Sequence, residues 1–312
     1  MSVQAIETGA VPDLAGLEPI ETIKRRWPMI LGGVLTVAMI AGLARELFGQ
    51  GLAGLNRATP ENPLFYLCFV LLYMSPPTGD YVIFRKLWRI PLGGLVALIK
   101  KRIANEVLLG YTGDAYFYAW ARAKATMVAA PFGAVKDVSI LSALAGNGIT
   151  LLMMAFALPL GFHLIPPDKM NLVLGSAGVT VAMSLPFLIF SRRVFSLPRG
   201  KLWWIFLIHC LRLVAGSVLI ALAWHFALPS VSVGMWLFLA AARLLVSRLP
   251  LVPNKDLLFA NFAILLIGQD QALSELIAFT AALTLLVHVA LIALFGIAGL
   301  MTRTKTWQTA QG

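Results

Sequence analysis

Long runs of apolar residues constrain this chain more than any other feature of its sequence. A helix needs about 20 apolar residues to cross a hydrocarbon core of roughly 30 Å, because each residue adds about 1.5 Å. Seven segments reach or approach that length: 28–48, 62–76, 138–161, 171–190, 202–227, 231–247 and 275–300. Since 59% of the 312 residues are hydrophobic and only 12% are charged, too little polar surface is available to cover a soluble fold. We predict an all-α, polytopic integral membrane helical bundle of about seven to eight spans.

The predicted organisation is one transmembrane domain between two short polar ends. A cytoplasmic N-terminal arm covers 1–27, the transmembrane domain covers 28–302, and a C-terminal tail covers 303–312. The arm begins polar and acidic, which is not the pattern of a cleavable signal peptide. The sequence contains no GxSxG, Walker or CxxC motif, and a soluble catalytic domain does not fit into the two ends. We therefore expect no enzyme activity, no cofactor and no metal site.

The net charge of +11 at pH 7 has two interpretations, membrane topology or a polyanionic partner. The basic residues are too sparse and dispersed for a nucleic-acid site, and they gather beside the expected spans, at 24–26, 85–89, 100–102, 122–136 and 192–201. By the positive-inside rule these segments are cytoplasmic. We predict a multi-pass protein of the cytoplasmic (inner) membrane with a cytoplasmic N-terminus, and keep a dedicated polyanion site as the alternative.

Two further apolar stretches, 103–121 and 250–268, are interrupted by turn-forming residues. The first contains Leu109-Gly110-Tyr111-Thr112-Gly113-Asp114, and the second opens with Pro250-Leu251-Val252-Pro253-Asn254-Lys255-Asp256. Irregular backbone at membrane depth is tolerated where it is buried in protein or lines a water-filled cavity. Paired discontinuous helices form substrate sites in many transporters. The first stretch is expected to enter and leave by the cytoplasmic face, the second either crosses or re-enters, and together they predict a central polar cavity.

The first interruption has a readable local geometry. Gly110 and Gly113 permit a sharp turn, and Thr112 suits the N-cap of a helix that begins at Gly113. The first amides of that helix would attract an anion. Asp114 would occupy the same amides and repel a phosphate unless a cation lay beside it. The alternative is a helix cap in a tight turn that binds no ligand.

Arg212 is the most unusual residue of the apolar runs. It lies ten residues beyond Lys201, so about 15 Å along the helix and near the bilayer midplane. Ionisable groups at that depth are costly and face an interior partner or a pathway. Its guanidinium suits either a phosphate of a ligand or a buried salt bridge to Asp114 or Glu106. His288 is also mid-span and is interpreted as a packing residue or, alternatively, a ligand or proton carrier. Arg243 is expected to reach toward the cytoplasm.

Residues 84–124 carry a motif that resembles a known pattern. After the basic stretch Phe84-Arg85-Lys86-Leu87-Trp88-Arg89 come Asn105, Gly110, Gly113 and Asp114. This is similar to the Asn-x-x-x-Pro-Gly-x-x-Gly-Glu/Asp motif of the lysylphosphatidylglycerol synthetase-type transmembrane (flippase) domain family. Here Leu109 stands at the proline position and the later arginine is missing. The counterpart of a second signature, Pro-Gly-Gly-x-Gly with an acidic residue, is Pro253-Asn254-Lys255-Asp256, which lacks the glycines. The chain thus resembles a divergent member.

The resemblance implies a helical membrane domain with re-entrant segments around a central cavity. Related proteins move polar lipids, so we predict a lipid transporter or flippase-like protein for a phospholipid, hopanoid or polyprenyl-linked lipid. The alternatives are a non-transporting scaffold for lipid-modifying enzymes and a membrane-embedded lipid transferase. The expected partners are membrane lipids with a polar headgroup, and an anionic headgroup is one alternative. No nucleic-acid partner is expected. The candidate substrate-binding residues are Asn105, Glu106, Gly110, Thr112, Gly113, Asp114, Arg212, Asn254, Asp256 and His288.

Overall fold

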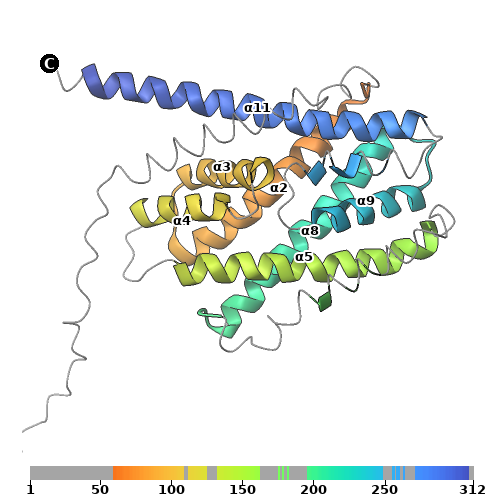
Figure 1. Ribbon diagram of the computed structural model, residues 1–312, viewed down its shortest axis with the longest axis horizontal. Coiled ribbons are helices and arrows are strands. Elements are labelled where there is room, and N and C mark those ends of the chain that lie inside the picture. The colour runs from red at the N-terminus through yellow and green to blue at the C-terminus, as the bar shows by residue number, and fades with distance from the viewer. Residues whose placement is uncertain are drawn as a thin grey trace, which may run out of the picture.

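The computed structural model describes five long parts of the chain and several short pieces. The long parts are 59–108, 112–124, 132–161, 195–248 and 271–308, and the short pieces are 175, 178, 181–182, 255–256, 258–260 and 263. Every regular element within these ranges is a helix, as predicted (Figure 1). The helices are α2 (Pro63–Trp88), α3 (Gly93–Val107), α4 (Thr112–Lys124), α5 (Phe132–Gly161), α8 (Arg199–Ala227), α9 (Val233–Ser247) and α11 (Gln271–Gln308).

Four helices in the described part of the chain are long and apolar enough to cross a membrane. They lie within α2, α5, α8 and α11, which confirms four of the expected spans as helices and agrees, by length and composition, with a helical membrane protein. The helix α9 has 15 residues and, at about 22 Å, is shorter than a bilayer core. The expected span 28–48 lies outside the described residues, as does all of 171–190 except four positions. The count of seven to eight spans stays a prediction.

The helix α2 extends beyond the expected segment 62–76. Asn62 caps its start, where the side-chain Oδ1 accepts a hydrogen bond from the Leu64 amide at 3.0 Å, and a proline occupies the first turn. The helix then continues through Pro76 and Pro77 to Trp88. The predicted end of this segment at residue 76 is therefore wrong. Prolines inside a membrane helix are tolerated where neighbouring groups satisfy the carbonyls that have lost their N–H partner.

The helices α3 and α4 pack against each other as a helical hairpin (Figure 1). The interruption predicted within 103–121 lies between them, since α3 ends at Val107 and α4 begins at Thr112. The topology argument treated the basic residues at 100–102 as part of a cytoplasmic loop, and this is wrong. They belong to α3, and Lys101 is only 7% exposed.

Two apolar clusters hold the helices together. One joins α3 and α4 to parts of α2, α5, α8 and α11, and includes Phe84, Leu98 and Phe117. The other joins α9 to the remaining parts of α2, α8 and α11, and includes Trp224 and Trp236. The helix α2 also packs along α8, and α5 packs along α8 and α9. Residues of both clusters line one cavity, together with several polar side chains.

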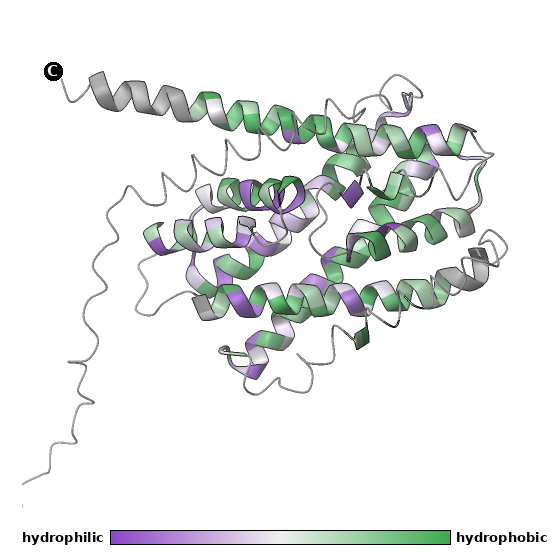
Figure 2. Ribbon diagram, in the orientation of Figure 1, coloured by the Kyte–Doolittle hydropathy of each residue, from purple (hydrophilic) through white to green (hydrophobic). Residues whose placement is uncertain are grey.

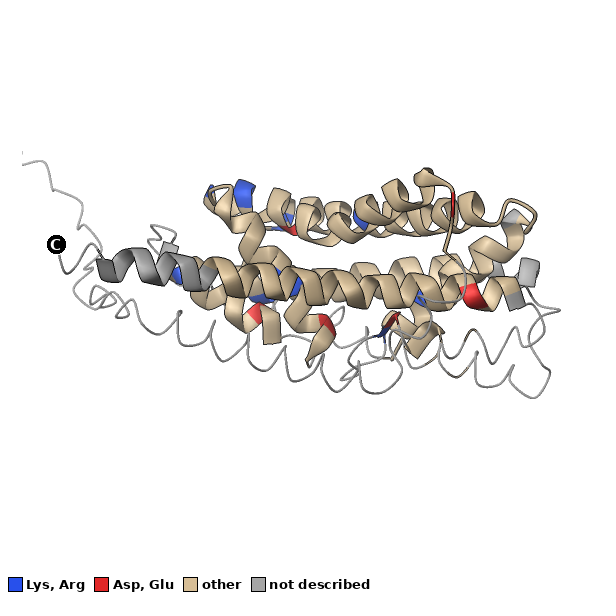
Figure 3. Ribbon diagram, turned by 90° about the horizontal axis from the view of Figure 1, so that it is seen from above, with Lys and Arg blue, Asp and Glu red and all other residues tan. Residues whose placement is uncertain are grey.

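The outer faces of the long helices are apolar. Hydrophobic colour dominates α8, α9 and α11, whereas hydrophilic colour interrupts α3 and α4 (Figure 2). Charged positions are few along the long helices (Figure 3). On α8 the exposed apolar residues recur every three or four positions, at Trp203, Leu207, Leu211, Val214, Val218 and Leu222. Such a stripe along one helix face is typical of a lipid-facing or partner-facing surface.

Candidate functional site

A cavity of about 980 Å³ lies between the helices and is lined by residues of both apolar clusters. Its walls come from α2, α3, α4, α5, α8, α9, residues 255–256 and α11. Seven basic and four acidic side chains line it: Lys101, Arg102, Lys136, Arg212, Arg243, Arg248 and Lys255, with Asp80, Glu106, Asp114 and Asp256. So many ionisable groups between apolar helices require internal partners, and the structure provides them unevenly.

Lys101 on α3 joins α2 to α4 through two carboxylates. Its Nζ lies 2.8 Å from Asp80 Oδ2 and 3.1 Å from Asp114 Oδ1. Burial by itself lowers the pKa of the Lys101 ammonium, but Asp114 and Asp80 outweigh that effect and raise the pKa above its usual value. The helix α3 is not among the four candidate spans. Lys101 therefore stays charged and holds both carboxylates. Asp80, Lys101 and Asp114 are called the Lys101 network below.

Asn105 and Asp114 fix the start of α4 against α3. The Asn105 Nδ2 donates to Asp114 Oδ2 at 2.8 Å, and its Oδ1 accepts from the Gly113 amide at 2.7 Å. The Thr112 hydroxyl donates to the Ala104 carbonyl at 3.1 Å. Gly113 lies so close to α3 that an added Cβ would overlap the Lys101 carbonyl oxygen. The Gly113 amide, one of those expected to attract an anion, is thus bound by Asn105.

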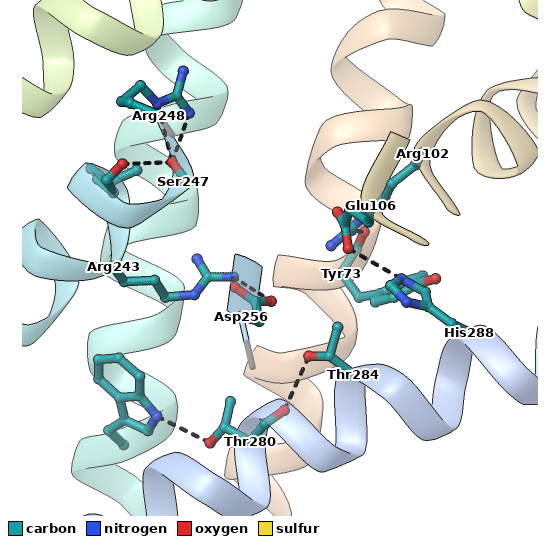
Figure 4. A network of polar contacts seen from close by, with 12 residues as sticks. Tyr73, Arg102, Glu106, Arg243, Ser247, Arg248, Asp256, Thr280, Thr284 and His288 are labelled. Atoms are coloured by element: carbon teal, nitrogen blue, oxygen red, sulfur yellow. Dashed lines mark hydrogen bonds and ion pairs between the residues drawn. The ribbon is translucent and has the colours of Figure 1, made fainter. Parts of the chain in front are cut away.

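Arg102 compensates for a proline of α2. Pro77 has no N–H to donate to the carbonyl of Tyr73, four residues earlier. Arg102 donates to that carbonyl through Nη1, and its guanidinium lies 4.1 Å from the centre of the Tyr73 ring. Its Nε also donates to Glu106 Oε1 at 2.8 Å, and Glu106 Oε2 lies 3.2 Å from His288 Nε2 on α11. This chain of contacts links the proline site of α2 to α11 through α3 (Figure 4).

Arg212 faces the same cavity from α8. Its Nε donates to His209 Nδ1 at 2.9 Å, and its Nη2 donates to Ser142 Oγ on α5 at 2.6 Å. Gly79 of α2 leaves room for its stem, because a Cβ there would lie 2.8 Å from Arg212 Cδ. Arg212 forms no ion pair with any carboxylate in the described ranges. The salt bridge to Asp114 or Glu106 that was one alternative is therefore not what holds it.

A second group of charges lies beside α9 and is called the α9 basic cluster: Arg243, Arg248 and Lys255. Arg243 Nη2 lies 2.8 Å from Asp256 Oδ1 and 2.9 Å from Oδ2 (Figure 4). Arg248 donates to Ser247 Oγ through Nε and Nη2, and Lys255 Nζ donates to the Ser247 carbonyl at 2.9 Å. Arg243 is held by a carboxylate and does not simply extend toward the cytoplasm, which corrects that expectation.

The structure brings six of the ten predicted site residues to one cavity. Asn105, Glu106, Asp114, Arg212, Asp256 and His288 line it. Thr112 and Gly113 instead hold the α3–α4 turn. Gly110 and Asn254 lie outside the described residues.

Sequence reasoning missed other residues of the site. Asp80 and Ser139 were not considered, although Ser139 Oγ donates to Asp114 Oδ1 at 2.7 Å. Lys101 and Arg102 were counted only as topology charges. One signal was available for Lys101: it follows Ala97 by four residues and precedes Ala104 by three, so it falls on the buried face of α3.

No metal site is evident among the described residues, where no three His, Cys, Asp or Glu side chains are grouped suitably. Comparison of the chain with protein-family models gave no match. Comparison with the curated proteins gave none either, nor did comparison with the solved structures. The resemblance to the flippase domain family therefore stays a prediction, and function must be argued from the cavity.

Proposed function

We propose that the protein binds and translocates a membrane lipid with a polar headgroup, which occupies the cavity between α2, α5, α8 and α9. The observation that carries this proposal is a charged cavity of about 980 Å³ among helices that are apolar enough to cross a membrane. A polar headgroup taken from water costs free energy unless it finds polar partners, and the cavity supplies such partners between apolar helices.

The cavity offers the groups that a headgroup needs when it leaves water. Hydrogen-bond donors of Arg212 and hydroxyls of Ser142 and Ser217 line its wall, and they would replace water around the headgroup. The two carboxylates of the Lys101 network already have the Lys101 ammonium as a partner, so this network would form a fixed part of the cavity wall. The apolar stripe on α8 would face the acyl chains. The resemblance of residues 84–124 to a lipid-translocating family is an independent motive for the same proposal.

The orientation within the membrane is part of the proposal. Basic residues lie in the last turn of α2 (Arg85 and Lys86) and in the first turn of α8 (Arg199 and Lys201). These two ends lie on the same side of the bundle, together with α3 and α4 (Figure 1). By the positive-inside rule this side would face the cytoplasm of the inner membrane.

Leaflet exchange in liposomes tests the proposal. The full chain is reconstituted into vesicles that contain fluorescent phospholipid, and the fraction of label reached by an external quencher is followed over time. We expect faster exchange than in empty vesicles and a clear loss with Arg212→Ala, while Arg85→Ala on the exposed end of α2 keeps the wild-type rate. Exchange no faster than in empty vesicles for every lipid tried would refute transport.

A second candidate function, a non-transporting scaffold, is favoured by one observation. The carboxylates of the Lys101 network and Glu106 already have basic partners, so these charges need no ligand. This alternative predicts that Arg212→Ala and Asp114→Asn both lower the thermal stability and that no lipid shifts it. A lipid-dependent rise in the unfolding temperature would decide against it.

A further inference from the structure

We propose that the α9 basic cluster binds a phosphate group, which is the anionic part of the ligand that enters the cavity. This inference rests on the proposed function and deepens it. It places the anion beside α9, and not at the turn between α3 and α4 where the sequence pattern suggests an anion site.

Lys255 of the α9 basic cluster forms no ion pair with a described carboxylate. Arg243 is paired with Asp256. Lys255, whose side chain also lines the cavity, donates to a neutral acceptor, the Ser247 carbonyl. Even when Arg248 is set aside, the cluster therefore has more cations than carboxylates. Like charges held close together in a half-buried place repel each other, and an added anion relieves that repulsion.

The cluster is built into the cavity wall. Arg243 and Ser247 are one helical turn apart on α9 and line the cavity together with Arg248, Lys255 and Asp256. Arg248 Nε and Nη2 lie 3.1 Å and 2.9 Å from Ser247 Oγ. Gly146 of α5 provides the space for the guanidinium, because a Cβ there would overlap Arg248 Nη1. Guanidinium and ammonium groups side by side suit the oxygens of a phosphate.

The α3–α4 side of the cavity is less suited to an anion. Asp80 and Asp114 lie on either side of Lys101, so an approaching phosphate would meet two carboxylates. The Gly113 amide, which a phosphate would need, is bound by Asn105 at 2.7 Å. Electrostatics therefore direct a phosphate across the cavity toward α9.

Thermal unfolding of the full chain in an uncharged detergent tests the site and identifies the source of the phosphate. The probes are dioctanoyl phosphatidic acid, dioctanoylglycerol with the same chains but no phosphate, and inorganic phosphate. We expect only phosphatidic acid to raise the unfolding temperature at low concentration. Equal stabilisation by dioctanoylglycerol would overturn the proposal. Equal stabilisation by inorganic phosphate would support a phosphate site and overturn a lipid headgroup as its source.

Substitutions locate the site within the cavity. Lys255→Gln should weaken the apparent affinity for phosphatidic acid about tenfold, or about 1.4 kcal/mol, and Lys255→Arg should retain it. Arg248→Gln removes a different cation of the cluster and should weaken binding similarly, which keeps the test decisive if Lys255→Gln does not fold. The matched control is Lys136→Gln, another cavity-lining lysine, whose Nζ lies 3.7 Å from Asp137 Oδ1. It should leave the affinity within about twofold.

The outcomes separate this inference from the proposed function. If Lys255→Gln and Arg248→Gln bind phosphatidic acid as the wild type does, the α9 site is wrong, while leaflet exchange that depends on Arg212 would still support transport. If phosphatidic acid binding depends on the α9 basic cluster but no exchange occurs, the phosphate site stands and transport is wrong.

Discussion

Lys101 and Lys255 line the same cavity, yet their surroundings differ. Lys101 is buried and lies within 3.1 Å of two carboxylates. Lys255 is half-buried and donates to one main-chain carbonyl. The first lysine stabilises the fold, because removing it would take the neighbouring cation away from both carboxylates. The second forms no ion pair with a described carboxylate. The comparison separates the part of the cavity that determines its shape from the part that can recognise a ligand.

The largest expected effect is on the Lys101 network. Lys101→Met removes the cation between Asp80 and Asp114 and should lower the free energy of unfolding by about 3–5 kcal/mol, the cost of breaking a buried ion pair from one side. Denaturant unfolding in detergent measures it. The control is Lys100→Met at the preceding residue of α3. The Nζ of Lys100 lies 5.0 Å from the centre of the Phe295 ring, and its loss should cost less than about 1 kcal/mol. Similar losses for both lysines would contradict the assignment.

The contact of α4 with α3 can be tested by adding one methyl group. Gly113→Ala places a Cβ against the Lys101 carbonyl and should destabilise the protein by about 1–3 kcal/mol through overpacking. In Gly148→Ala on α5 the new Cβ meets nothing within 4 Å, so this variant should be neutral or more stable by up to about 1 kcal/mol. If both variants unfold at the same temperature, α3 and α4 do not approach closely at Gly113.

The bond from Arg102 to the Tyr73 carbonyl should contribute a smaller amount. Arg102→Lys loses the planar guanidinium that reaches the carbonyl and Glu106 together, and should cost about 1–2 kcal/mol. Pro77→Ala restores an N–H that can donate to the Tyr73 carbonyl, so Arg102→Lys should cost less in that background. A double-mutant cycle of unfolding free energies measures the coupling. Strictly additive costs would show that Arg102 does not compensate for Pro77.

The smallest effect on stability is expected at the α9 basic cluster. Lys255→Gln should change the free energy of unfolding by less than about 1 kcal/mol, because it removes one hydrogen bond to a carbonyl from a half-buried side chain. The free energies of unfolding of Lys255→Gln and Lys101→Met, both measured without lipid, test the comparison of the two lysines directly. A loss as large as that of Lys101→Met would mean that Lys255 is a structural residue.

The sequence predicted helices well where a continuous run of apolar residues determines them. The apolar runs predicted α5, α8 and α11, although the helices extend by three to eight residues beyond the predicted ends at one or both termini, and the interruption between α3 and α4 was located by its glycines. The end of α2 was missed, because Pro76 and Pro77 are normally helix-breaking residues. Arg102 helps the helix to continue, because it donates to the Tyr73 carbonyl, 29 residues earlier in the chain.

The candidate site was predicted only in part, for a related reason. Asp114 and Arg212 were recognisable as charges in apolar surroundings, and both line the cavity. Their partners on α5 were not recognisable. Asp114 accepts from Ser139, 25 residues away, and Arg212 donates to Ser142, 70 residues away. Spacing along a helix predicts neighbours three or four residues apart, but it carries no information on partners from another helix.

Apolar runs and the positions of charges within them determined by themselves that this chain forms a helical bundle of the membrane type, since the length and hydropathy of a helix are local properties. Only the tertiary structure decided which charges are paired with an opposite charge. Asp80 comes from α2, Lys101 from α3 and Asp114 from α4, and the packing of these three helices brings the charges together. Lys255, beside α9, instead donates to a main-chain carbonyl and has no described carboxylate partner. An ion pair depends on distance in space, and the packing of helices sets that distance.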